Sequence, residues 1–293
     1  MDIQQPADNG QAALWNGRAG RAWVDAQEVL NQTFKSFEEL LVEPLVAGAA
    51  SRVLDIGCGT GSTTLAAARR LGASGRCVGV DISDVMITAA RARAEREPMP
   101  ASFIRADAET FAFTPASFDM IISRFGVMFF GDPVRAFANL RQAAGKDAGL
   151  RFIAWRSAAD NPFMTTAERA AAPLLPTLPA RRPGAPGQFA FADQSLVHRI
   201  LDESGWTAIE IRPIDVACTL PETALVGYLT RLGPLGQILP DVDAATRERV
   251  ITTVRAAFDP YVHGAEVRFT AACWMVCAEV RSAVALPPGT ASA

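Results

Sequence analysis

The sequence predicts a doubly wound α/β fold, in which helices cover both faces of a mostly parallel sheet. Between residues 51 and 155, short apolar runs rich in β-forming residues alternate with helical stretches. Such alternation implies right-handed βαβ crossovers and a parallel sheet. Residues 52–56 and 119–122 are largely apolar, as strands buried on both faces usually are. A glycine-rich turn between the first strand and the first helix of this series is the third indication.

The elements of this series can be assigned in chain order. Strands are expected at residues 51–56, 76–81, 101–106, 118–123 and 150–155. Helices are expected between them at residues 63–71, 84–97 and 133–144. Ahead of the series, residues 12–48 carry apolar side chains at helical spacings, and Gly17 and Gly20 interrupt their start. This pattern predicts a short helix, a break, and one or two longer helices.

After residue 155 the regular alternation stops, and two insertions are expected. Residues 157–192 are rich in proline and alanine, and residues 221–260 have a helical pattern. Between the insertions, Asp193 is a good N-cap for a helix that ends near Ser204. Further strands are expected at 206–219, with an interruption near Pro213, and at 265–280. The predicted divisions are an N-terminal helical lid segment (1–48), one α/β domain (49–285) and a disordered tail (286–293).

The composition excludes several classes of protein. Of the 293 residues, 49% are apolar and 20% are charged, which is typical of a well-packed domain rather than a disordered chain. The net charge of −3 provides no general basic field for nucleic acid. No signal peptide is evident, and no apolar stretch approaches the roughly 20 residues that span a bilayer. Five cysteines without a CxxC pair, beside two histidines, predict a metal-free cytoplasmic protein with reduced thiols.

The strongest motif is Val-Leu-Asp-Ile-Gly-Cys-Gly-Thr-Gly at residues 53–61. A glycine-rich turn between strand and helix lets a ligand approach the backbone closely. A dinucleotide fingerprint G-x-G-x-x-G would need a third glycine at Ser62, and Asp55 would repel a diphosphate. A carboxylate at Asp55 instead suits a ligand with a cationic ammonium group. S-adenosylmethionine (SAM) has such a group, a sulfonium and no phosphate, so the motif argues against an NAD(P)-dependent oxidoreductase.

Acidic residues also follow the second and third strands. Asp81 ends the second strand, where its carboxylate can accept hydrogen bonds from ribose hydroxyls, although NAD proteins use the same device. Alternatively, Asp81 caps the helix that follows. Asp107, with Ala108 beside it, can accept from an adenine amine, or it is an ordinary turn residue. After the fourth strand, the polar start and aromatic run of residues 123–130 would line the crevice in which open α/β sheets bind ligands.

At this point residues 51–156 resemble the class I SAM-dependent methyltransferases, particularly the UbiE-like branch. Residues 53–61 are similar to the first motif of that family, Asp81 to its acidic second-strand residue, and Asp107 with Ala108 to its adenine-contacting pair. Residues 144–150 look like its Leu-x-Pro-Gly-Gly turn, degraded here to Lys-Asp-Ala-Gly. The resemblance implies a seven-stranded, Rossmann-like sheet with an antiparallel last strand. It also implies methyl transfer from SAM that leaves S-adenosylhomocysteine (SAH), but it does not imply an acceptor.

Fourteen residues are candidates for cofactor binding. Trp15 is included because a tryptophan before the flexible Asn16-Gly17 could fold over the cleft. The full set is Trp15, Asp55, Gly57, Cys58, Gly59, Gly61, Asp81, Ile82, Met86, Asp107, Ala108, Ser123, Arg124 and Phe125. No catalytic residue is assigned. Outside the cofactor motifs, His198, His263, Tyr228, Tyr261 and scattered acids are candidate bases, and the two histidines are interpreted as surface or packing residues.

The expected substrate is a small, partly apolar molecule, because the aromatic and aliphatic residues of the appended segments could form a lid. Nucleic acid is not expected as a partner, since the arginines on the surface are sparse. A homodimer is compatible with the insertions. The alternatives left open are a protein that binds SAM or SAH without catalysis and, less favoured, an NAD(P)-dependent oxidoreductase.

Overall fold

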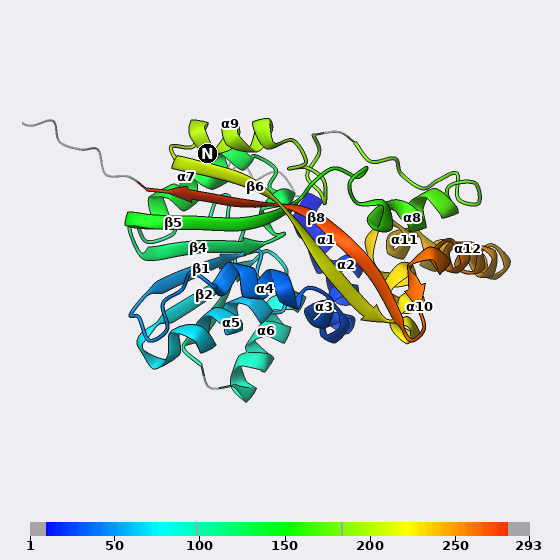
Figure 1. Cartoon of the computed structure of the whole chain (residues 1–293), viewed down its shortest axis with the longest axis horizontal. Helices are drawn as coiled ribbons and strands as arrows, with labels where there is room; N and C mark the ends of the chain where they lie inside the picture. Colours follow the sequence, from blue (N-terminus) through cyan, green and yellow to red (C-terminus); the bar gives the residue numbers. More distant parts are fainter. Residues whose placement is uncertain (1–9, 98, 183, 281–293) are drawn as a thin grey trace, which may run out of the picture.

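The computed structural model describes residues 10–97, 99–182 and 184–280, and it contains one twisted sheet (Figure 1). The hydrogen-bonded order of the strands along this sheet is β3-β2-β1-β4-β5-β8-β6. The parallel strands are β1 (Arg52–Ile56), β2 (Arg76–Asp81), β3 (Ala101–Arg105), β4 (Phe118–Arg124) and β5 (Ala144–Trp155). β8 (Glu266–Glu279) runs antiparallel to both β5 and β6 (Thr207–Pro221). This topology confirms the predicted doubly wound fold with an antiparallel last strand.

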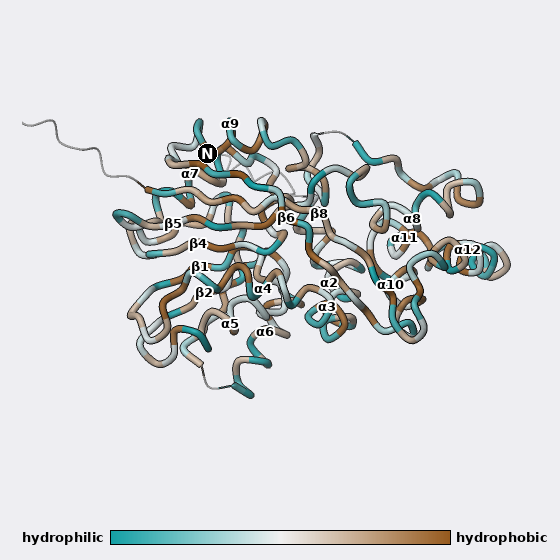
Figure 2. Tube along the Cα trace, in the orientation of Figure 1, coloured by the Kyte–Doolittle hydropathy of each residue, from teal (hydrophilic) through white to brown (hydrophobic). Residues whose placement is uncertain are grey.

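The order of the strands reverses between β1 and β4. From β1 the chain proceeds outward to β2 and β3, and it then returns to place β4 on the other side of β1. Ligands of open α/β sheets bind at such a switch point, outside the carboxyl ends of the strands. The two strands beside it are among the most apolar parts of the chain (Figure 2). Val53, Leu54 and Ile56 of β1 are at most 1% exposed, as expected for a strand covered on both faces.

Helices follow the strands as the sequence predicts, and most begin at recognisable caps. α5 (Ser62–Leu71) follows β1, α6 (Asp84–Arg96) follows β2, α7 (Pro133–Ala143) follows β4, and α9 (Gln194–Glu203) precedes β6. The side chains of Ser83, Asp132 and Asp193 accept backbone N–H groups at the starts of α6, α7 and α9. The predicted N-cap at Asp193 is therefore confirmed.

The N-terminal segment differs from its prediction. It contains four short helices, α1 (Gly10–Asn16), α2 (Arg18–Asp25), α3 (Gln27–Thr33) and α4 (Lys35–Val42). The expected break is present at Gly17, but two further breaks occur at Ala26 and Phe34, which carry no helix-breaking signal. Phe34 and Phe37 are buried, and both contact Phe125 at the end of β4, so tertiary packing sets the directions of these helices.

A helical lobe extends beyond the sheet at the right of Figure 1. β8 pairs with β5 only from Cys273 to Glu279, but it pairs with β6 down to Glu266, so the far halves of β6 and β8 form a two-stranded ribbon. β7 (Val262–His263) joins this ribbon as a short additional strand beyond the seven implied by the resemblance. Around the ribbon lie α8 (Pro162–Ala171), α10 (Glu222–Arg231), α11 (Gly233–Ile238) and α12 (Ala244–Ala257).

Two strands differ from the sequence prediction in their irregularities. β5 begins at Ala144 rather than at residue 150, and the expected turn is a bulge around Asp147, whose φ is +61°. β6 is not interrupted at Pro213, which pairs with Trp274, because β6 is an edge strand and tolerates the missing N–H. The irregularity of β6 lies instead at Ala208, between Thr207 and Glu210.

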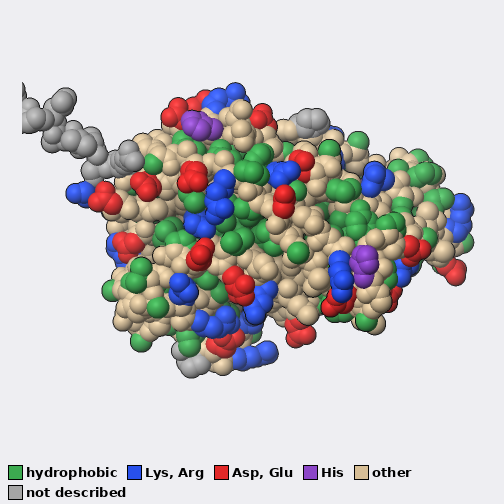
Figure 3. Space-filling view, viewed as in Figure 1, with side chains coloured by type: hydrophobic (Ala, Val, Ile, Leu, Met, Phe, Trp, Pro, Cys, Tyr) green, Lys and Arg blue, Asp and Glu red, His purple; other side chains and the backbone are tan. Residues whose placement is uncertain are grey.

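The remaining predictions on organisation are only partly addressed. The proposed tail at 286–293 lies outside the described residues, and the division at residue 48 stays a prediction. Within the described ranges, no helix is both long enough and apolar enough to span a bilayer. Acidic and basic side chains are intermixed on the face shown in Figure 3.

Candidate functional site

The site begins where the turn after β1 meets the segment after β4. Gly57 has a φ of +64°, which disfavours any side chain, and a Cβ built on it would lie 2.6 Å from Cα of Gly126. A Cβ on Gly126 would lie 2.5 Å from the carbonyl oxygen of Ile56. The two backbones therefore touch at the switch point, and both glycines are required there. The glycine motif identifies Gly57 individually, whereas Gly126 is covered only by the run of residues 123–130 that is expected to line the crevice.

The other two glycines of the motif have different roles. Gly61 has a φ of +84° at the start of α5, and a Cβ there would lie 2.8 Å from the ring of Phe103. Gly59 has a φ of +55°, but a Cβ on it would meet only the sulfur of Met86, at 3.7 Å. Gly59 therefore faces open space in the cleft, while Gly61 fits α5 against its neighbours.

Asp81 connects this turn to the start of α6. Its Oδ2 accepts the N–H of Gly59 at 2.8 Å, and its Oδ1 accepts the N–H of Ser83 at 2.9 Å. Burial raises the pKa of the Asp81 carboxyl, and the backbone donors oppose that shift. The N-cap of α6 is Ser83, not Asp81, which answers the alternative interpretation of Asp81 as a helix cap. Asp81 instead lines the cleft.

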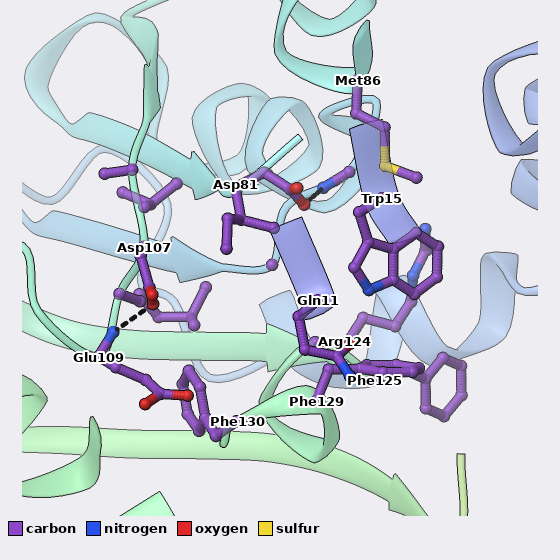
Figure 4. Close-up of a pocket in the computed structure, with 18 of the residues that line it drawn as sticks. Gln11, Trp15, Asp81, Met86, Asp107, Glu109, Arg124, Phe125, Phe129 and Phe130 are labelled. Atoms are coloured by element: carbon purple, nitrogen blue, oxygen red, sulfur yellow. Dashed lines mark hydrogen bonds between the residues drawn. The ribbon is translucent and has the colours of Figure 1, made fainter. Parts of the chain in front are cut away.

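A cavity lies over the carboxyl ends of β1, β2, β3 and β4 (Figure 4). Asp81, Asp107 and Glu109 lie on one side of it in this view, and Trp15 and Phe129 lie on the other. Ten of the fourteen candidate residues line it, namely Trp15, Gly57, Gly59, Asp81, Ile82, Met86, Asp107, Ala108, Arg124 and Phe125. The wall also contains residues outside that candidate set: Gln11, Trp23, Ile56, Val80, Ala106, Glu109, Gly126, Phe129 and Phe130. Only the aromatic run of residues 123–130 offered a local signal for any of these.

Four candidates do not line this cavity: Asp55, Cys58, Gly61 and Ser123. Asp55 is 1% exposed, and its Oδ2 accepts the hydroxyl of Thr64 at 2.7 Å. Burial, the largest influence, raises the pKa of the Asp55 carboxyl to about 7. Ser123 donates its hydroxyl to the carbonyl of Ile56 at 2.7 Å. These side chains support the turn from beneath, and their predicted contact with a cofactor stays a prediction.

Helix α1 closes one side of the cleft. The hydroxyl of Ser83 donates to the carbonyl of Trp15 at 2.6 Å, and the N–H of Asp84 donates to Oδ1 of Asn16 at 2.8 Å. Nδ2 of Asn16 donates to the carbonyl of Ile82 at 3.3 Å. These bonds fix the first helix on the turn between β2 and α6. They explain how Trp15, which is 68 residues from Ser83 in the sequence, reaches the wall of the cavity.

A second and larger cavity adjoins the first, with a volume of about 410 Å³ against 130 Å³. The two share the side chains of Trp15, Trp23, Phe125 and Phe129. The second cavity is bounded by the N-terminal helices, by α8, α10 and α11 of the helical lobe, and by Pro179, Arg181 and residues 186–188. Its wall is mostly apolar, with Leu30, Phe34, Trp155, Phe163 and Leu235 among its members.

Of the four residues considered as bases, only Tyr228 lines either cavity. His198 lies on the exposed surface of α9, and His263 lies at the tip of the ribbon. Tyr261 packs against Phe163, with ring centroids 5.1 Å apart. The structure therefore provides no histidine base among the described residues of the two cavities.

Comparison with known families bears on this geometry. Residues 53–147 match the model of a methyltransferase domain family. This part of the chain is therefore similar to a methyltransferase domain. The match covers β1 to the bulge of β5, which carries most of the first cavity but neither the N-terminal helices nor the helical lobe.

Several curated relatives match part of the chain. The chain is 43% identical over 89 residues to an aklanonic acid methyltransferase of Streptomyces sp., which covers 30% of this chain and 40% of that protein. It is 28% identical over 155 residues to an uncharacterised protein of Mycobacterium bovis, covering 53% of this chain and 56% of the relative. The chain thus spans about half the length of the curated relatives that it matches.

Solved structures support the fold over most of the chain. The YcgJ protein of Bacillus subtilis covers 85% of this chain and all of its own, with a TM-score of 0.57 and 17% identity. A protein of Bacillus halodurans that is described as a candidate methyltransferase covers 84% of this chain and all of its own. Its TM-score is 0.55 and its identity is 15%. A [4+2]-cyclase, SpnF, covers 90% of this chain and 96% of its own, with a TM-score of 0.53 and 17% identity. The class I methyltransferase fold is therefore confirmed, but a cyclase shares it, so the fold alone does not define the reaction. The domain match supports SAM as the cofactor.

Proposed function

We propose that this protein is a SAM-dependent methyltransferase that methylates a small, partly apolar molecule and releases SAH. The observation that carries the proposal is the junction of the two cavities. A cleft built from a glycine turn and the carboxylate of Asp81 opens, through a ring of aromatic side chains, into a larger apolar cavity. The resemblance to the UbiE-like branch and the expected cytoplasmic location belong to the same proposal.

The residues of the first cavity fit the cofactor in chemistry. Gly57 and Gly59 leave room for a ligand against the backbone. The carboxylate of Asp81 would hold the ribose hydroxyls, Asp107 and Ala108 would meet the adenine, and Ile82 and Met86 would supply apolar contact beside it. When bound, SAM supplies a methyl group already activated on a sulfonium. The protein then has to position the acceptor and exclude water.

The aromatic side chains between the cavities suit that second task. Trp15 packs edge to face on Phe129 with ring centroids 5.1 Å apart, and on Trp23 at 5.9 Å. Phe125 stacks on Trp155 at 4.8 Å and 17°, which fixes the opposite side of the passage. Such a passage is rigid and apolar. The relative that acts on aklanonic acid makes that compound a suitable first acceptor to try.

The proposal is tested by calorimetric titration with SAM, SAH and NADH. We expect the wild-type protein to bind the two adenosyl compounds and not NADH. Asp81→Asn should weaken binding of SAH at least tenfold, because the carboxylate faces the cleft and also holds the N–H of Gly59. Asp84→Asn is the matched control, since it removes the same charge three residues away on an exposed position.

Two results would overturn parts of the proposal. Binding of NADH, or of none of the three ligands, would contradict the assignment of the cofactor. The protein could also bind SAH but fail to convert SAM to SAH with each acceptor tested. That result would favour a non-catalytic binding protein, and the cyclase shows that this fold also occurs in a protein named for another reaction.

A further inference from the structure

The second cavity contains few groups that ionise. Among its described lining residues these are Glu168, Arg181, Tyr228 and Arg231, and no histidine, lysine, aspartate or cysteine is present. A methyl acceptor that carries a weakly acidic proton needs a base nearby to remove that proton. The chemistry of these four side chains therefore limits which acceptors the cavity can serve.

None of the four is suited to act as a base. Glu168 lies in an ion pair with Arg181, whose Nε donates to Oε2 of Glu168 at 2.9 Å. Arg181 also lies over the ring of Phe189, 4.7 Å from its centroid, which holds the pair in place. Burial raises the pKa of the Tyr228 hydroxyl well above its ordinary value, so this group stays protonated at neutral pH. Arginine side chains remain protonated in proteins.

The acids of the first cavity are also engaged. Glu109 accepts the N–H of Gly131 and Nη2 of Arg135, the latter at 3.0 Å. Asp81 accepts two backbone N–H groups, as described above, and Oδ1 of Asp107 accepts the N–H of Glu109 at 3.0 Å. The passage between the cavities consists of aromatic side chains, which offer no proton acceptor. In the described parts of both cavities, no carboxylate or imidazole faces the passage without such a partner.

Arg231 gives the rim of the second cavity a positive charge. It is the last residue of α10, and it lines the cavity as an exposed residue whose guanidinium lies beside Gly227. Among the ion pairs of the described residues, none involves Arg231. Since Arg181 and Glu168 neutralise each other, the wall carries a net charge of one positive unit from Arg231. A cation at the rim of an apolar cavity favours an anionic ligand over its neutral form.

We propose that the acceptor is an oxyanion on a large apolar body, which binds already ionised, and that Arg231 selects this ionised form. This inference rests on the proposed function. The methyl carbon forms a bond to the oxygen, using an oxygen lone pair, while its bond to the sulfonium sulfur breaks and sulfur keeps that electron pair. The products are a methyl ester or methyl ether and a neutral thioether, and no proton is transferred to the protein. Carboxylates and acidic phenolates share this chemistry.

Binding measurements test the role of Arg231. The probes are 2-naphthoate and its neutral analogue 2-naphthamide, titrated into the SAH-loaded protein. We expect Arg231→Met to weaken binding of 2-naphthoate about three- to tenfold, the range expected for one charge near the protein surface, and to leave 2-naphthamide unchanged. Arg249→Met on α12, an exposed arginine outside the cavity, should change neither affinity. Equal affinities of the wild-type protein for the two probes would overturn the selection of an anion.

The pH dependence of turnover tests the absence of a base. With a series of naphthols bearing zero, one or two nitro groups, the midpoint of the kcat/KM profile should follow the acidity of each acceptor. A carboxylate acceptor should show no fall in rate at neutral pH. A midpoint that stays constant across the series would reveal a protein base and refute the inference. Failure to bind SAH would instead overturn the proposed function, so the two failures are distinguishable.

Discussion

Glycine is required at the switch point for two reasons, a left-handed φ and the close approach of two backbones. The contact between Gly57 and Gly126 allows the two reasons to be measured separately. Gly57→Ala places a Cβ at a φ of +64° and 2.6 Å from Cα of Gly126. Gly126→Ala introduces the same close contact, at 2.5 Å from the carbonyl oxygen of Ile56 and 2.7 Å from Cα of Gly57, but at an ordinary φ of −73°. Gly264→Ala is the control for the left-handed φ alone, because Gly264 has a φ of +66° and no atom lies within 4 Å of a Cβ built on it.

The three variants should differ in a defined order. A left-handed φ costs a residue with a side chain about 1–2 kcal/mol, which is the loss expected for Gly264→Ala. Forcing a methyl group into closely packed backbone costs about 1–3 kcal/mol, which is the loss expected for Gly126→Ala. Gly57→Ala combines both and should lose about 2–5 kcal/mol. The free energy of unfolding in urea gives these values, and calorimetry with SAH shows the effect on the cleft.

The reasoning makes one comparison decisive. If Gly57→Ala and Gly264→Ala destabilise the protein equally, the close approach of the two backbones contributes nothing, and the description of the switch point is wrong. Retained affinity of Gly57→Ala for SAH would further contradict the placement of the cofactor against this turn. Gly264→Ala should keep the affinity of the wild type, because Gly264 lies in the turn between β7 and β8, away from both cavities.

Three further predictions follow from the contacts described. Burial raises the pKa of Asp55 to about 7 from an ordinary 3.8, so its contribution to stability is complete below about pH 4 and is lost as the pH rises through 7. The difference between these two pKa values corresponds to about 4 kcal/mol of stability. The free energy of unfolding should therefore decline less between pH 4 and 8 in Asp55→Asn than in the wild type. Parallel declines in the two proteins would show that Asp55 does not cause the pH dependence. Asn161→Ala should lower the free energy of unfolding by about 2–4 kcal/mol, because the buried amide both donates to and accepts from the backbone of Ala272, at 2.9 Å each. Unfolding in urea measures this loss, and a clearly smaller loss would show that the two hydrogen bonds do not stabilise the fold. Trp15→Ala should weaken binding of both SAH and 2-naphthoate, whereas a loss confined to one of them would contradict its position between the cavities.

The parallel half of the fold could be predicted closely from the sequence because its signals are local. β2 and the strands beside it are short apolar runs, and each helix after them begins at a cap or a glycine. The same locality explains why the glycine turn and Asp81 were found. The breaks at Ala26 and Phe34 could not be predicted, because they arise where short helices fold around the end of β4.

The geometry around the glycine turn shows what a motif leaves open. Asp55 precedes the turn, and its side chain accepts the hydroxyl of Thr64 on α5, while its contact with a cofactor stays a prediction. Sequence position does not reveal which face of a strand meets the cleft when both faces are buried. The second cavity is predicted from the sequence only as an apolar lid of the appended segments. Its wall combines residues from α1 to Phe258, just after α12, and these residues meet only after the ribbon has formed.

The attachment of α1 to the turn between β2 and α6 has a thermodynamic consequence. Trp15 belongs to the walls of both cavities, and three hydrogen bonds connect its helix to the segment that follows Asp81. A ligand that orders this helix lowers the entropy lost by a second ligand that contacts the same helix. The affinities of the two cavities are then linked, and linkage of this kind is reciprocal, so each ligand strengthens binding of the other by the same factor. Trp15 is therefore the position at which such a linkage would be measured, as an equal change in the affinities of both cavities.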